Sequence, residues 1–232
     1  MTYVQLFLRY ELELEKAHEE PESLTFTFRN LKNLDFTEFT LLLRQEVSQE
    51  DRQLIERIAD RLLAHEPAQY IIGHEVFHDL RFKVDERVLI PRPETAELVD
   101  LILAENEAEQ VDLLDLGTGS GAIAIALAHS RPDWQVQASD ISQKALSLAR
   151  ENAQANQVVV DFQQSDVFSQ LSGSFDIIAS NPPYISEADK HEVGLNVLNS
   201  EPHLALFADE EGLAIYRKIA DQAGKYLKPS GK

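Results

Sequence analysis

Cysteine is absent from this chain of 232 residues. That absence excludes a disulfide framework, a cysteine-ligated metal site and thiol chemistry, and it fits a reducing compartment. Basic residues are also scarce, because 21 Lys and Arg stand against 40 Asp and Glu, for a formal net charge of −19. Proteins that bind nucleic acid rely on lysine and arginine contacts to phosphate groups. The charge balance therefore argues against direct binding to nucleic acid.

Long apolar runs are missing too. The short apolar stretch at residues 4–8 is followed at once by Arg9 and Glu11, so it is neither the core of a signal peptide nor a membrane span. No other run approaches the length of a membrane span, and we expect a cytoplasmic protein without membrane contact. The hydrophobic fraction of 44% is ample for a core, and the length allows one large or two small domains.

Residues 1–75 carry helical patterns and are predicted to form a small helical domain. The first segment, to about residue 18, is amphipathic, and residues 54–63 follow a helical period. The alternating segment 23–28 resembles a strand but is interpreted as helical, because its neighbours are helical. Two residue pairs have the spacing of helix-capping boxes: Asp35 with Glu38, and Ser48 with Asp51.

Residues 76–92 are predicted to form a β-hairpin linker. Segments 76–84 and 87–90 have the composition of two strands, with the turn between them at Asp85-Glu86. The rigid sequence Pro91-Arg92-Pro93-Glu94-Thr95 then leads into a helix predicted at residues 96–105.

From residue 111 onward, strand and helix patterns alternate. Strands are predicted at 111–115, 134–139, 158–162 and 175–180, and helices at 122–129, 142–155 and 211–227. This alternation predicts an α/β fold in which helices cover both faces of a parallel sheet. We assign residues 93–232 to this domain.

A glycine loop, Gly117-Thr118-Gly119-Ser120-Gly121, joins the first of these strands to its helix. Glycines let the backbone turn sharply and let a ligand approach closely. The spacing is neither that of dinucleotide-binding folds nor that of the Walker motif, and no lysine follows to reach a phosphate, which argues against NAD and ATP. Taken alone, the loop is as consistent with a tight turn as with a binding site.

Three aspartates near the glycine loop favour a ligand-binding site. Asp140 ends the second strand, where a carboxylate accepts both ribose hydroxyls of a nucleoside. Asp166 follows the third strand and meets either an adenine amino group or the start of a helix as its N-cap. Asp115 bonds loop amides or a ligand ammonium group, whereas the plainer role for Asp140 is a solvated strand end. Together these acids suit a nucleoside with a positive charge, which describes S-adenosylmethionine.

The sequence Asn181-Pro182-Pro183-Tyr184 directly follows the strand predicted at 175–180. Neither proline has an N–H for the ladder, so the strand must end in a stiff loop at its carboxyl end, where open α/β sheets bind ligands. The motif suits a planar amide or amino group. Asn181 and the Pro182 carbonyl accept its two N–H hydrogens, and Tyr184 stacks on its plane.

These motifs resemble those of class I methyltransferases, which have a Rossmann-like sheet. Further stretches narrow the resemblance to the peptide chain release factor glutamine N5-methyltransferases, the HemK/PrmC family: 70–73, 89–95, 201–206 and 211–213. The resemblance covers nearly the whole chain and is weakest over residues 1–65. It implies transfer of a methyl group from S-adenosylmethionine to the glutamine amide of the Gly-Gly-Gln motif in release factors, leaving S-adenosylhomocysteine.

The resemblance also implies roles for individual residues. The glycine loop, Asp140, Val167 and Asn181 would line the cofactor, with Asp115 and Asp166 beside them. Residues 181–184 would hold the glutamine, and Asn181, Pro182 and Tyr184 would form the catalytic set. The helical domain of residues 1–75 would help to hold the release factor.

The chain departs from the family pattern at two places. Ala96 stands where a glutamate usually follows Pro-Arg-Pro-Glu-Thr. The chain stops at residue 232, about where the family begins a fifth strand, so we expect a C-terminally truncated sheet with the fourth strand as an exposed edge. Two alternatives stay open: a nucleic-acid methyltransferase acting on adenine N6 or guanine N2, and a non-catalytic cofactor-binding fragment.

Overall fold

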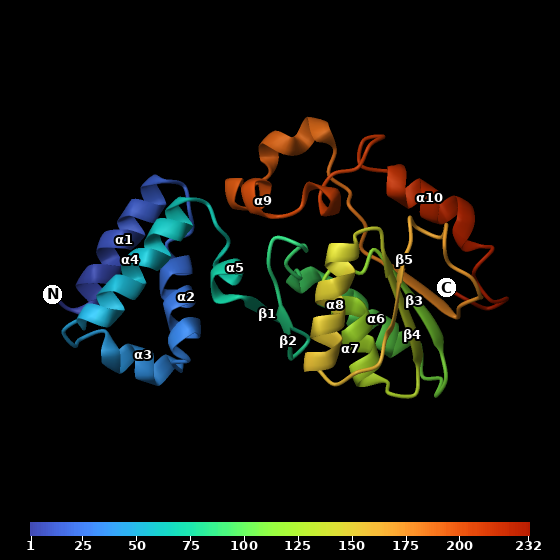
Figure 1. The fold of residues 1–232 in the computed structure, drawn as a ribbon, viewed down its shortest axis with the longest axis horizontal. Coiled ribbons are helices and arrows are strands. Elements are labelled where there is room, and N and C mark those ends of the chain that lie inside the picture. The colour runs from blue at the N-terminus through green and yellow to red at the C-terminus, as the bar shows by residue number, and fades with distance from the viewer. The chain divides into compact units, whose positions relative to one another are not determined.

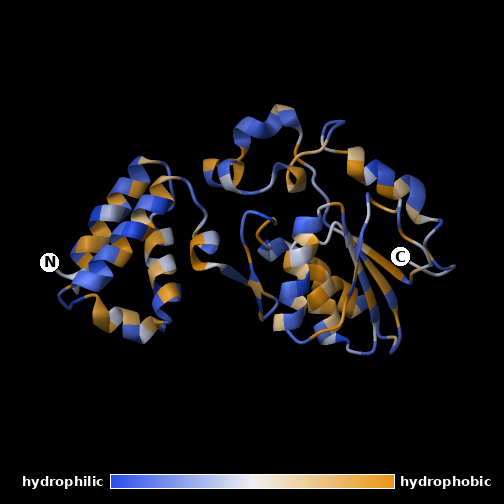
Figure 2. Cartoon of the chain, in the orientation of Figure 1, coloured by the Kyte–Doolittle hydropathy of each residue, from blue (hydrophilic) through white to orange (hydrophobic).

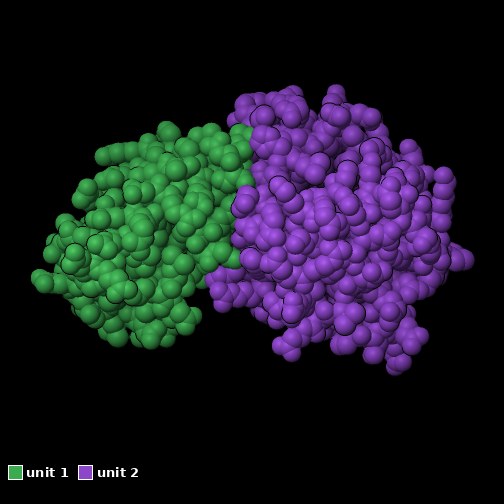
Figure 3. All heavy atoms as spheres, in the orientation of Figure 1, with its two compact units in different colours: residues 1–73, 194–200 green, residues 74–193, 201–232 purple.

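The computed structural model describes residues 1–232 and divides into two compact units, which Figure 3 colours separately. The first unit comprises residues 1–73 and 194–200, and the second comprises residues 74–193 and 201–232. None of the helices combines the length and the apolar character needed to cross a membrane.

The first unit is entirely helical (Figure 1). Its helices are α1 (Tyr3–Lys16), α2 (Glu22–Lys32), α3 (Phe36–Leu42), α4 (Gln49–Leu63), α5 (Ala68–Ile72) and α9 (Leu195–Ser200). The segment 23–28 lies within α2, which confirms its interpretation as helical. The core is aromatic, because the rings of Phe7 and Phe28 meet edge to face at 5.3 Å and both side chains are fully buried.

The two predicted capping boxes differ in outcome. Asp35 and Glu38 bond each other's backbone N–H and form a complete box at the start of α3. Ser48 caps α4 by accepting the N–H of Asp51, but Asp51 does not return the bond, so that half of the prediction is wrong. The Asp51 carboxylate instead accepts the Tyr3 hydroxyl and, at 2.8 Å, the Lys32 ammonium. These charged and buried partners outcompete a single backbone N–H.

The β-hairpin is present, but in another register than predicted. Strand β1 (His74–Phe77) pairs antiparallel with β2 (Leu80–Lys83), so the predicted strand 76–84 contains the turn, and residues 87–90 form no strand. The turn is at His78 and Asp79, whose φ angles are 49° and 61°. A two-residue hairpin turn with left-handed backbone at both positions matches the twist of the strands, and His and Asp tolerate that backbone better than most residues.

The second unit is built on a four-stranded parallel sheet (Figure 1). Its strands are β3 (Asp112–Leu116), β4 (Gln135–Asp140), β5 (Asp161–Gln164) and β6 (Ile177–Ser180), in the order β5-β4-β3-β6. The third strand starts three residues later than predicted. The N–H of Val158 bonds Ala153 O at the end of the preceding helix, so Val158 belongs to the helix terminus. Val159 is 92% exposed and pairs with no strand.

Helices cover both faces of this sheet. They are α6 (Pro93–Glu105), α7 (Ala122–Ser130), α8 (Gln143–Ala155) and α10 (Ala214–Ala223), with short 3-10 helices η1 (Glu187–Glu192) and η2 (His203–Ala205). Leu113 of β3 packs in one core cluster with α7, whereas Leu114 packs in another with Ile219 of α10. Successive residues of a strand point to opposite faces, so α7 and α10 lie on opposite sides. Helix α7 is apolar along most of its length (Figure 2) because it is almost entirely buried.

The outer edge of β6 is not bare. After α10 the chain runs back beside it, where the N–H of Phe175 bonds Tyr226 O (2.7 Å) and the N–H of Ile178 bonds Lys232 O (2.9 Å). The N–H of Lys232 returns a bond to Asp176 O (2.9 Å). Strand β6 is an edge of the four-stranded sheet, as predicted, but the C-terminal residues satisfy part of its backbone.

Candidate active site

A cavity of about 360 Å³ lies at the carboxyl ends of β3, β4 and β6, within the second unit. Its lining residues belong to the segments 87–95, 116–123, 139–145, 165–167, 180–183, 202–205 and 215–219. Parallel strands bring loops from distant parts of the chain together at this edge, so most of the predicted site residues meet here.

The glycine loop forms one wall of the cavity. Its turn is fixed by the N–H groups of Gly117 and Thr118, which both bond Ser139 O at 2.8 and 2.9 Å. Gly117 and Gly119 have left-handed backbones, with φ of 72° and 55°, and a Cβ added to either would meet nothing within 4 Å. The backbone of the loop therefore faces open space, and a ligand can approach it closely.

Gly121 has a different role from the other loop glycines. It is the N-cap of α7 with φ of 86°, and it does not line the cavity. A Cβ there would lie 2.7 Å from Ile125 Cδ1 and 3.3 Å from Ala149 Cβ. The glycine lets α7 and α8 approach each other and shapes the loop from behind.

Asp115 lies beneath the glycine loop and has no exposed surface. One carboxylate oxygen accepts the Thr118 hydroxyl at 2.6 Å and the N–H of Ala124 at 3.3 Å, whereas Oδ1 has no hydrogen-bond partner. Burial raises the pKa of this carboxyl to about 7, against the two hydrogen bonds that favour the charged form. A buried unpartnered oxygen is costly, so Asp115 is not explained by loop geometry alone.

Asp140 and Asp166 both line the cavity, but they differ in burial and in hydrogen-bond partners. Asp140 accepts the N–H groups of Gly119 (2.9 Å) and Ser142 (2.8 Å), and burial raises the pKa of its carboxyl. Asp166 is exposed, and its Oδ1 lies 3.8 Å from Lys218 Nζ of α10. Neighbouring Val167 also lines the cavity, with a φ of 49° that is rare for a β-branched residue.

Asn181, Pro182 and Pro183 line the same cavity, but Tyr184 does not. The Asn181 side-chain amide donates to Thr95 Oγ1 at 3.1 Å, which ties the loop after β6 to the start of α6. Tyr184 is 62% exposed, so the structure does not bring its ring together with the other predicted residues.

The segment around Gly212 supports this loop from outside. Ile185 and Phe207 form a parallel bridge, and a Cβ added to Gly212 would lie 2.1 Å from Tyr184 O. Gly212 has φ of 83°, so it both turns the chain and lets two backbones touch. The conformation of residues 181–185 therefore depends on a segment almost thirty residues downstream.

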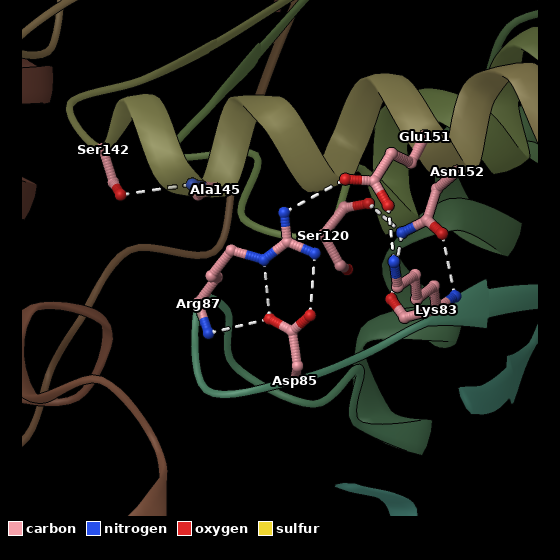
Figure 4. Close-up of polar contacts among 8 residues, drawn as sticks. All are labelled: Lys83, Asp85, Arg87, Ser120, Ser142, Ala145, Glu151 and Asn152. Atoms are coloured by element: carbon pink, nitrogen blue, oxygen red, sulfur yellow. Dashed lines mark hydrogen bonds and ion pairs between the residues drawn. The ribbon is translucent and has the colours of Figure 1, made fainter. Parts of the chain in front are cut away.

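Asn152 is a residue that the sequence analysis missed. Figure 4 shows it pointing from α8 to the hairpin and to the glycine loop: its Nδ2 donates to Ser120 O (2.9 Å) and Lys83 O (3.1 Å), and its Oδ1 accepts the Lys83 N–H (2.8 Å). Arg87, in the cavity wall, pairs with Asp85 (2.7 Å) and Glu151 (3.1 Å) beside it. The signal was an asparagine inside an apolar helical period, where a buried amide must find partners.

Glu201 is the second residue that was missed. Its side chain is almost fully buried, with Oε1 accepting Arg92 Nη2 at 2.7 Å and Oε2 accepting the N–H of Ile90 at 3.1 Å. It thus joins two walls of the cavity, residues 87–95 and 202–205. It begins the stretch 201–206 that narrows the family resemblance, but no local pattern predicts its role, since its partners lie more than one hundred residues away.

Comparisons with known proteins agree in outline with this arrangement. The family of the methyltransferase small domain matches residues 95–206, and the PrmC N-terminal domain matches residues 5–73. The release factor glutamine methyltransferase of Streptococcus pneumoniae is 60% identical over 233 residues, which are 100% of this chain and 84% of that protein. The protein of the same name from Lactococcus lactis is 53% identical over 214 residues, 92% of this chain and 79% of that protein.

Proposed function

The chain belongs to the family of release factor glutamine methyltransferases, and on that premise we propose the reaction that it catalyses. It transfers a methyl group from S-adenosylmethionine to the side-chain amide nitrogen of the glutamine in the Gly-Gly-Gln motif of a peptide chain release factor. The observation that carries this proposal is that Asn181 and Pro182 line the same cavity as the glycine loop. A group suited to an amide and a group suited to a nucleoside thus share one cavity.

The residues of the cavity fit this cofactor. The open backbone at Gly117 and Gly119 accommodates a close ligand, and Asp140 offers a carboxylate to ribose hydroxyls at a strand end. Asp115 is fully buried and does not line the cavity, so we place its carboxyl behind the glycine loop. The carboxylate of Asp166 and the neighbouring Val167, which both line the cavity, suit an adenine edge. We assign Thr118, Ser120 and Asn181 to the same lining, and Gly121 to the packing that shapes it.

When bound, S-adenosylmethionine supplies an electrophilic methyl group on a sulfonium sulfur, which becomes a neutral thioether. The protein must present a poor nucleophile to it, because the amide nitrogen shares its lone pair with the carbonyl. Asn181 Oδ1 and the Pro182 carbonyl accept the two N–H hydrogens of the glutamine amide and aim its nitrogen. These acceptors also stabilise the positive charge that develops on nitrogen during transfer.

No general base is needed in this scheme. The methylated nitrogen is strongly acidic until it loses one proton, which it releases to water. The exposed ring of Tyr184 stands outside the cavity lining, at 62% exposure, and it covers the amide plane after the glutamine has entered. Its role is therefore to hold the seated substrate.

We assign the helical residues 1–75 to holding the release factor, residues 76–92 to the linker and residues 93–232 to methyl transfer. Three apolar residues of α1 support a protein partner, since Val4, Leu8 and Leu12 are spaced by four and exposed along one helix face. Because release factors act in translation, the reaction takes place in the cytoplasm. The excess of acidic residues argues against a nucleic-acid substrate.

Methyl transfer to a purified release factor tests the proposal. Labelled S-adenosylmethionine is incubated with the chain and either the wild-type release factor or a variant whose Gly-Gly-Gln glutamine is alanine. We expect label on the wild type alone. Equal labelling of both proteins would assign the chemistry to another acceptor, and labelling of neither, with bound cofactor present, would make the chain a binding module.

A further inference from the structure

Thr95 lies in the first turn of α6, where the helix meets the cavity. Its hydroxyl is not used to cap that helix, because the N-cap residue is Arg92 and the cap has no side-chain hydrogen bond. Its N–H is already bonded to Arg92 O at 3.0 Å. The hydroxyl is instead directed to Asn181, whose Nδ2 donates to it at 3.1 Å.

In this bond the NH2 end of the Asn181 carboxamide faces Thr95. The carboxamide has an NH2 donor end and a carbonyl acceptor end, and only the carbonyl end can accept an N–H from a glutamine amide. With the NH2 end held by Thr95, the carbonyl oxygen is left for the substrate. The reversed carboxamide would present two donors to an amide NH2 group and repel it.

Thr95 is itself held in place by a buried anchor. Glu201 accepts a hydrogen bond from the N–H of Ile90 at 3.1 Å and another from the guanidinium of Arg92 at 2.7 Å. These two bonds fix the segment just before Thr95. Pro91 and Pro93 add backbone stiffness on either side of Arg92. The segment from Ile90 to Thr95 is thus stiff, with its first residues bonded to Glu201 and its last residue bonded to Asn181.

We propose that Thr95 is a positioning residue for methyl transfer. Its hydroxyl holds the Asn181 carboxamide with the carbonyl oxygen turned to the glutamine amide. The hydrogen bonds from Ile90 and Arg92 to Glu201 hold Thr95 in its position. This inference rests on the proposed function for its kinetic consequence, but the orientation of Asn181 is a property of the protein alone.

Two variants separate the hydroxyl from the rest of the side chain. Thr95→Val removes the hydroxyl and is expected to lower kcat about tenfold, because an incorrectly oriented Asn181 costs one well-placed hydrogen bond. The Kd for S-adenosylmethionine and the KM for the release factor should change by less than about threefold, since Asn181 acts on one side chain of a large substrate. Thr95→Ser restores the hydroxyl and should keep kcat within about threefold of wild type.

A matched control lies at the other end of the same helix. Asn106 Nδ2 donates to Ile102 O at 2.7 Å, and Asn106→Ala removes that single bond without touching the cavity. It should leave kcat within about twofold of wild type. A kcat for Thr95→Val within twofold of wild type, or a Thr95→Ser variant as impaired as Thr95→Val, would overturn the proposal.

A second readout does not depend on turnover. The side-chain NH2 signals of Asn181 in an amide proton–nitrogen spectrum are identified by their loss in Asn181→Ala. They should shift in Thr95→Val and stay near their wild-type position in Thr95→Ser and Asn106→Ala. Signals that do not move in Thr95→Val would refute the positioning role. If wild-type protein methylates no release factor but the signals move as expected, the proposed function fails and the orientation of Asn181 by Thr95 stands.

Discussion

The side-chain amide of Asn152 donates a 2.9 Å hydrogen bond to the main-chain carbonyl of Ser120, the fourth residue of the glycine loop. Asn152 is buried, and the same amide group also bonds the backbone of Lys83 in the hairpin. One side chain thus fixes the loop, the hairpin and α8 to each other. The glycine loop has a defined shape because hydrogen bonds from the residues behind it hold it, although glycine by itself allows many backbone conformations.

Asn152→Ala is therefore expected to lower the free energy of unfolding by about 2–4 kcal/mol, because one buried and two partly buried backbone groups lose their partner. It should also weaken S-adenosylmethionine binding, since Ser120 O is no longer held. Asn156→Ala is the matched control: Asn156 Nδ2 bonds Arg81 O in the hairpin but not the glycine loop. Chemical denaturation and calorimetry measure both effects. Equal loss of cofactor affinity in the two variants would contradict the role of Asn152.

Gly212→Ala is expected to impair turnover more than cofactor binding. The added Cβ would overlap Tyr184 O, at 2.1 Å, and residue 212 has φ of 83°, so residues 181–185 must move. Gly173→Ala provides the control, because Gly173 also has a positive φ, of 101°, but has open space around its Cβ. Both variants should lose about 1 kcal/mol of stability from backbone strain, and Gly212→Ala should lose more because of the overlap with Tyr184 O. Only Gly212→Ala should lower kcat, by at least about tenfold.

The stability of the cofactor-free protein should depend on Asp115 and on pH. Its carboxyl has a pKa of about 7 when folded and an ordinary pKa of 3.8 when unfolded. Between pH 4 and pH 7 the folded protein keeps a proton on this carboxyl that the unfolded protein has lost. The free energy of unfolding therefore falls as pH rises from about 4 to about 7, and it stays low at higher pH. Asp115→Asn removes this dependence and should be more stable than wild type at pH 8, by up to about 4 kcal/mol.

Urea unfolding of both proteins at pH 5, 6, 7 and 8 checks this expectation. The difference in unfolding free energy, wild type minus Asp115→Asn, should become steadily more negative up to pH 7. A difference that is constant with pH would mean that the buried carboxyl is charged throughout this range.

Asn181→Ala should lower the rate of the chemical step far more than it lowers cofactor affinity. Its carbonyl is proposed to act on the glutamine amide, so the effect belongs to the transition state. Single-turnover methyl transfer is expected to slow by about a hundredfold, and the Kd for S-adenosylmethionine to change by less than about threefold. Equal losses in rate and affinity would assign Asn181 to the cofactor alone.

Local chemistry in the sequence predicted much of this molecule. The α/β class, the helical N-terminal region and the parallel strand that ends just before Asn181 follow from the hydrophobic period and from proline chemistry. Capping by Asp35 and Ser48 was also predictable, because an N-cap depends on residues only three apart. Each of these features is decided within a few residues of the chain.

Other features depend on contacts that local patterns do not encode. The hairpin turn fell at His78-Asp79 and not at Asp85-Glu86, because Phe77 and Phe82 must both enter the core, with their rings 5.9 Å apart. The third strand begins at Asp161 because Val158 bonds the end of α8 and Val159 is exposed. Strand register is set by which side chains reach the core, and alternating segments allow more than one choice.

The sequence by itself determined which chemical groups this protein has: a glycine loop after one strand, an aspartate after the next, and an asparagine and two prolines after the last. Only the tertiary structure decided how they are held. Asn152, Thr95 and Glu201 act on the site through partners 32, 86 and 111 residues away. The physical reason is that a hydrogen bond needs an atom at about 3 Å in a defined direction, and only the folded chain brings such distant atoms together.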